Sequence, residues 1–179
     1  DETVEIYVDQ NGYEIIINAD GVPHHQSPYF VSTWAESNNG FYYFIDENED
    51  GINDMWTEAD SDMNLNPNRI AEQELEFRVP LYPFFNSSGP SDTHLGPCGA
   101  SLNGVPLYDR YEGPNQELNP NTIQTFDQGN GHPAPQGRYH YHFPPAFLMD
   151  VEETNFIGFS ADGFPVYSPK NPDGTNADD

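Results

Sequence analysis

The chain has 179 residues, a length that fits one domain with a buried core. Its 30 acidic residues against 5 lysines and arginines give a formal net charge of -25. Such a charge excludes nucleic acid and anionic membrane surfaces as partners and favours divalent cations. Aromatic residues make up 14% of the chain, which predicts a folded core rather than an acidic disordered segment.

The cellular compartment is indicated by several weak features taken together. No apolar run approaches the roughly 18 residues of a membrane-spanning helix, so we expect no membrane insertion. Cys98 is the only cysteine, which rules out a disulfide within the chain. The sequence begins at Asp1, and we interpret it as a mature chain whose leader was removed. With few lysines and a glycosylation sequon at Asn86, this predicts a secreted protein, extracellular or at the cell surface.

Alternating apolar residues predict β-strands from the start of the chain. Residues 3–8 and 13–17 alternate in this way, and Asn11-Gly12 between them is typical of a hairpin turn. Further strands are expected at 41–45, 75–82, 138–143, 155–161 and 164–167. The best helical candidate, residues 68–75, is short, because 17 prolines and 15 glycines interrupt the chain. We predict one all-β domain over residues 1–179, a β-sandwich with long loops and a loop-like tail at 168–179.

An acidic loop, DENEDGIND (46–54), has oxygen-bearing side chains at alternating positions. Gly51 falls where such a loop must turn sharply, and calcium requires six to eight hard oxygen ligands. The spacing resembles the calcium loops of EF-hand and thrombospondin-type repeats, although Thr57 occupies the position of the usual closing acid. The expected calcium ligands are Asp46, Asn48, Asp50, the Ile52 carbonyl, Asp54 and Glu58. The alternative is a solvated acidic turn.

Histidines form a second candidate site in FDQGNGHPAPQGRYHYH (126–142). In an extended strand His140 and His142 lie on one face, close enough to share an ion. His132 precedes them across a Gly- and Pro-rich turn, and a hairpin-like return would bring it, with Asp127, against the pair. Neutral imidazoles suit zinc or copper. The alternative is that these rings only form hydrogen bonds to backbone carbonyls.

The same segment resembles the signature of the YHYH-domain family of exported proteins. Three further segments resemble motifs of that family in the same order: GVPHH (21–25), LGPCGASLNGVP (95–106) and IGFSADGFPVY (157–167). The resemblance implies that His25 joins the histidine cluster, but it implies no established reaction. One departure is that Gln128-Gly129 stands where the family often has Glu-Cys.

Three functions are compatible with these features. The first is an extracellular metal-binding structural subunit. Its N-terminal strand, residues 1–8, would join other copies head to tail into filaments, with calcium neutralising the acidic contacts. The second is a secreted metal-dependent hydrolase or oxidase that uses the histidines, although no general base and no nucleophile motif accompanies them. The third is a carbohydrate-binding module that uses some of the 11 tyrosines and 2 tryptophans as stacking platforms.

Overall fold

The computed structural model describes residues 3–25, 27–30, 42–45, 54–57, 66–89, 91–93, 95–113, 116–149 and 155–168, with only the backbone at 28, 42–45, 54–57 and 149. It is mostly β, with short helices, and its largest element is a mixed six-stranded sheet in the order β10-β11-β7-β6-β12-β13. The pair β11–β7 is parallel and the remaining pairs are antiparallel. Its strands are β6 (Pro97–Ser101), β7 (Pro106–Tyr108), β10 (Gly131–Pro133), β11 (Tyr139–Tyr141), β12 (Phe156–Ser160) and β13 (Pro165–Tyr167).

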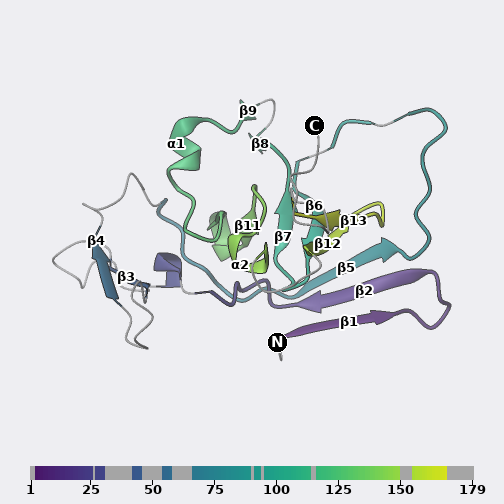
Figure 1. Ribbon diagram of the computed structural model, residues 1–179, viewed down its shortest axis with the longest axis horizontal. Helices are drawn as coiled ribbons and strands as arrows, with labels where there is room; N and C mark the ends of the chain where they lie inside the picture. The colour runs from purple at the N-terminus through teal and green to yellow at the C-terminus, as the bar shows by residue number, and fades with distance from the viewer. Residues whose placement is uncertain are drawn as a thin grey trace.

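A second sheet of three antiparallel strands, β1-β2-β5, contains the start of the chain (Figure 1). Its strands are β1 (Val4–Val8), β2 (Glu14–Ala19) and β5 (Leu75–Pro80). Asp9 holds the turn of the predicted hairpin, since its Oδ1 accepts hydrogen bonds from the backbone of Tyr13 and Glu14 at 2.8 and 3.0 Å. Gly12 supplies the left-handed φ of 74° that this turn requires. The hairpin prediction is confirmed.

The remaining elements are small. Two-stranded sheets are formed by β3 (Tyr42–Ile45) with β4 (Asp54–Thr57), and by β8 (Tyr111–Gly113) with β9 (Gln116–Glu117). The helices are α1 (Pro120–Ile123), α2 (Ala146–Met149) and the 3-10 turns η1 (Pro28–Phe30) and η3 (Pro135–Gly137). The prediction of a β-rich chain with only short helices is confirmed, whereas the sandwich arrangement remains a prediction.

One apolar cluster joins the two larger sheets. Ile15 and Ile17 of β2 and Val79 of β5 pack against Ala100 of β6, and all four are buried. Each fully buried aliphatic side chain of this size contributes roughly 1.5–3 kcal/mol. Close backbone approach within the large sheet requires Gly158, because a Cβ there would lie 2.1 Å from the carbonyl oxygen of Ala100. The cluster therefore packs the three-stranded sheet against β6 of the large sheet.

The predicted helix at residues 68–75 is wrong. This segment is extended coil that leads into β5, because its N–H groups bond to distant segments instead of to the preceding turn. Ile70, Ala71 and Gln73 donate to the carbonyls of Tyr29, Gly137 and Asp20. The segment therefore ties the N-terminal part of the chain to the region around β11.

The first strand lies in the chain's own sheet. Residues 4–8 pair with residues 15–19 of β2, so this segment is the first strand of the chain's own sheet. Of the predicted tail, only Ser168 lies among the described residues. The strands expected at 155–161 and 164–167 are β12 and β13, and a turn at Asp162-Gly163 joins them. In this turn the Ser160 amide donates to the Phe164 carbonyl and the Gly163 amide donates to the Ser160 carbonyl.

Candidate metal centre

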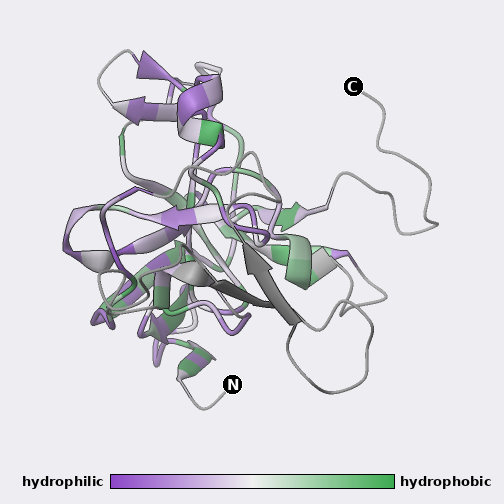
Figure 2. Cartoon of the chain, turned by 90° about the vertical axis from the view of Figure 1, so that its left-hand side faces the viewer, coloured by the Kyte–Doolittle hydropathy of each residue, from purple (hydrophilic) through white to green (hydrophobic). Residues whose placement is uncertain are grey.

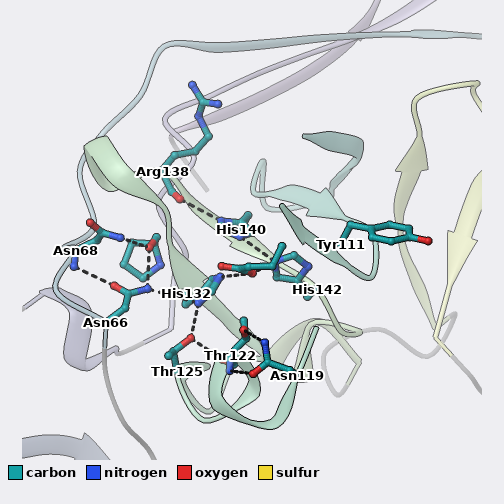
Figure 3. A network of polar contacts seen from close by, with 12 residues as sticks. Asn66, Asn68, Tyr111, Asn119, Thr122, Thr125, His132, Arg138, His140 and His142 are labelled. Carbon is teal, nitrogen blue, oxygen red and sulfur yellow. Dashed lines mark hydrogen bonds and ion pairs between the residues drawn. The ribbon is translucent and has the colours of Figure 1, made fainter. Parts of the chain in front are cut away.

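Three histidines converge on one side of β10 and β11 (Figure 3). His132 of β10 lies directly opposite His140 of β11 in the antiparallel register, and His142 follows one residue after the strand ends. Each ring offers a nitrogen within 4.8 Å of the nitrogens offered by the other two. The prediction that the chain returns His132 to the pair His140 and His142 is therefore confirmed. The alternation of a β-strand turns Tyr139 and Tyr141 to the opposite face.

Hydrogen bonds at the far side of each ring fix how the imidazoles are protonated. The Nδ1 atoms of His140 and His142 lie 3.2 and 2.6 Å from the carbonyl oxygens of Arg138 and Asp109, which can only accept. Both Nδ1 atoms therefore carry hydrogen, and each Nε2 presents a lone pair to the centre. Hydrogen bonding to backbone carbonyls, the alternative role for these rings, therefore occupies only Nδ1 of each ring. The Nε2 atom of each ring still faces the centre.

His132 reaches the same state through a hydroxyl group. Its Nδ1 lies 2.5 Å from Oγ1 of Thr125, and that hydroxyl donates its own hydrogen to the Thr122 carbonyl at 2.6 Å. The amide nitrogen of Asn66, which can only donate, lies much farther from Nδ1, at 3.5 Å. The short contact decides the assignment: Thr125 accepts from Nδ1, so the Nε2 atom of His132 also faces the centre without a hydrogen. Such second-sphere contacts are what orient metal-binding imidazoles.

The Nε2 atoms of His140 and His142, which are both hydrogen-bond acceptors, face each other. The Nε2 atoms of His140 and His142 are 3.1 Å apart, and both carry lone pairs. Two acceptors at this distance need a positive charge between them, either a proton or a metal ion. Nitrogens bound to one tetrahedral zinc at about 2.0–2.1 Å stand roughly 3.3 Å apart, which is close to this separation.

Burial favours the neutral form of His132 and His140. It lowers the pKa of His132 to about 4 and lowers the pKa of His140 well below its ordinary value, with neighbouring histidines adding to the shift of His140. The side chains of His132 and His142 are only 3% and 1% exposed. Neutral rings with Nε2 lone pairs are the form in which histidine binds a metal.

A fourth group, Glu112, completes the centre. Its Oε2 lies 3.4 Å from Nε2 of His142 and 3.7 Å from Nε2 of His132. Glu112 was not predicted from the sequence, because it stands in the short strand β8, twenty residues before His132, with no metal-ligand spacing around it.

A pocket of about 240 Å³ opens beside the three histidines and Glu112. Asn66, Asn68, Tyr108 and Tyr111 contribute to its other walls. The ring of Tyr108 lies against His140 with the centroids 4.1 Å apart, and Phe126 stacks on His142 at 5.5 Å. Aromatic rings thus flank the histidines, and this pocket gives access to them.

His25 and Asp127 were expected in this cluster, but the structure pairs them with each other. Their Nε2 and Oδ2 atoms are 3.2 Å apart, and Asp127 also accepts hydrogen bonds from Ser27 at 2.5 Å and Tyr139 at 2.6 Å. The Asp127 side chain is fully buried, and these donors compensate its charge. Gly129 is required here, because a Cβ would lie 2.3 Å from Cε1 of His25. This second cluster occupies the tyrosine face of β11.

The other predicted sites stay predictions. The calcium residues Asp46, Asn48, Asp50, Ile52 and Glu58 lie outside the described residues, and Asp54 is the first residue of β4, paired with Ile45. Asn86 is exposed, and its side chain accepts a hydrogen bond from the Ser88 amide in a turn, which leaves glycosylation a prediction. Among the helices of the described residues, none has the length and apolar character to cross a membrane.

Fold and centre together define a β-rich protein with a buried cluster of three histidines. The chain belongs to the YHYH protein family, whose model matches residues 76–179, more than half of its length. The matched range contains Glu112, Asp127 and the three histidines, whereas His25 lies before it. Comparisons with curated proteins and with solved structures found no match.

Proposed function

We propose that this protein binds one divalent transition-metal ion, zinc or copper(II), at His132, His140, His142 and Glu112. The observation that carries the proposal is the 3.1 Å separation of the two Nε2 atoms whose hydrogens are on Nδ1. A proton shared by this pair would give a partner to the Nε2 lone pairs of two rings only. A metal ion would bind the lone pairs of all three rings and the Glu112 carboxylate as well.

The ligand set supports zinc or copper over calcium or magnesium at this position. Imidazole nitrogen is intermediate between hard and soft ligands and suits zinc and copper. Calcium and magnesium are hard cations that require a shell made mostly of oxygen. One carboxylate oxygen with three nitrogens matches four-coordinate zinc or tetragonal copper(II). The bound ion would hold β8, β10 and the end of β11 together, and would act as a structural rivet.

Calorimetric titration of zinc into chelator-treated protein tests the proposal. We expect one ion per chain in the wild type and no binding at this site after His140→Ala and His142→Ala are combined. His24→Ala is the matched control, because His24 is an exposed histidine whose Nδ1 bonds to Asn103 outside the cluster. Equal zinc binding by the double variant would overturn the proposal.

We further propose that the protein is extracellular and joins other copies of itself through the edge of β1. The outer edge of β1 pairs with no strand among the described residues. Ile6 and Val8 lie on the face of β1 that turns to the core, yet they are 42% and 49% exposed. Hydrophobic and hydrophilic residues alternate along this strand next to the N-terminus (Figure 2). The strand carries no lysine or proline, the residues that usually protect an edge from pairing.

Charge makes this association dependent on cations. Copies with a net charge of -25 repel each other, so calcium at the 46–54 loop would favour assembly. Light scattering after gel filtration, with and without calcium chloride, would detect this self-association. We expect larger particles with calcium, abolished by Ile6→Lys and retained in Tyr82→Lys, an exposed position after β5. Particles of monomer size under both conditions would reject assembly.

A further inference from the structure

The four groups around the proposed metal are held with unequal firmness. The rings of His132, His140 and His142 are buried, and each is anchored at Nδ1 by a hydrogen bond. Glu112 comes from β8, whose one strand partner among the described residues is the two-residue strand β9, and its side chain is 32% exposed. Within the described residues, its hydrogen-bonding and ionic contacts are those to His132 and His142.

A carboxylate held only by the ion and two rings can leave at small cost. Firm metal ligands are hydrogen-bonded behind the donor atom, as the three imidazoles are, and Glu112 has no such support. The pocket of about 240 Å³ lies on the side of Glu112, so space for another molecule adjoins the position that its oxygen takes. This volume is below that of sites for drug-sized ligands, which indicates a ligand of few atoms.

Charge selects the kind of ligand. A divalent ion with three neutral imidazoles and Glu112 carries a net charge of +1, and the departure of Glu112 leaves +2 in a buried site. A neutral ligand would leave that excess, whereas a monoanion restores the original balance. The net negative charge of the protein opposes an approaching anion, but at physiological salt this repulsion is screened beyond about 8 Å.

We propose that Glu112 is an exchangeable ligand and that the metal centre takes a small monoanionic donor in its place. The inference rests on the metal binding proposed above. It assigns the centre a binding site open to the pocket, in addition to its structural role. Metal sites that exchange one ligand are those that can act on a bound molecule, whereas closed sites with four fixed ligands are structural.

Cobalt(II) substitution with azide as the probe tests this directly, because the visible bands of cobalt report its ligands. We expect azide to shift the bands of the wild type with a saturable titration. Glu112→Gln should bind cobalt more weakly but azide about tenfold more tightly, because an anionic competitor is lost. Glu117→Gln on β9 is the matched control, since this exposed acid of the same hairpin pairs with Arg110 away from the histidines.

The possible results separate the two proposals. Failure of cobalt to bind the wild type would overturn metal binding itself. Cobalt bands that azide leaves unchanged would overturn the exchangeable position and leave metal binding intact. Equal azide affinity in the wild type and in Glu112→Gln would show that azide does not replace Glu112, and this too would overturn the inference.

Discussion

Acidification should destabilise the metal-free protein through its buried histidines. Burial lowers the pKa of His132 to about 4, against an ordinary value of 6.5. Between these two values the unfolded chain binds a proton at this residue and the folded chain does not. Stability is therefore complete above about pH 7 and is lost progressively as the pH falls toward 4.

The magnitude follows from the shift. At pH 5 the unfolded histidine is almost fully protonated and the folded one is mostly neutral, so the loss from His132 alone relative to pH 7.5 is roughly 2 kcal/mol. Relief of repulsion among the many carboxylates opposes this loss, which makes a comparison with a variant necessary.

Urea unfolding at pH 7.5 and pH 5, in the presence of a chelator, would measure the effect. His132→Gln keeps a polar side chain but cannot take up a proton, so its stability should fall by about 2 kcal/mol less than that of the wild type over this interval. The exposed His24 provides the control, and His24→Gln should keep most of the wild-type dependence. If the wild type and His132→Gln responded to pH equally, the reasoning from a buried neutral imidazole would be refuted.

Two substitutions test the supports of the two clusters. Thr125→Val removes the acceptor for Nδ1 of His132 and should weaken zinc binding by about 10–100-fold in calorimetry; unchanged affinity would show that the hydroxyl does not orient the ring. Gly129→Ala places a Cβ 2.3 Å from Cε1 of His25 and should cost about 1–3 kcal/mol in urea unfolding. Gly113→Ala meets only ordinary contacts beyond 3.8 Å, and a similar loss there would contradict the steric explanation.

The strands that follow simple alternation were predictable, and those in the centre of the large sheet were not. Residues 4–8 and 14–19 alternate and are separated by a turn signal, so local pattern alone indicates their pairing. In contrast, β6 has the sequence PCGAS, in which glycine and alanine allow close backbone approach but carry no strand signal. Residues 68–75 have helical propensity, yet their N–H groups bond to three distant segments, which no local pattern shows.

The residues of the candidate metal centre also differ in how far the sequence predicts them. His132, His140 and His142 were predicted because strand alternation and a short return place them together. Glu112 arrives through β8, whose position depends on the parallel pairing of β7 with β11, a long-range contact that sequence spacing does not reveal. His25 was assigned to the cluster through the family resemblance. In the structure His25 contacts Asp127, which accepts a hydrogen bond from Tyr139 on the other face of β11.

X-ray absorption at the zinc edge of the zinc-loaded protein tests the metal centre most directly. The account predicts one ion per chain with three imidazole nitrogens and one oxygen at about 2.0–2.1 Å. A shell composed of oxygen alone, or one that keeps its imidazole signal after His140→Ala and His142→Ala are combined, would contradict it.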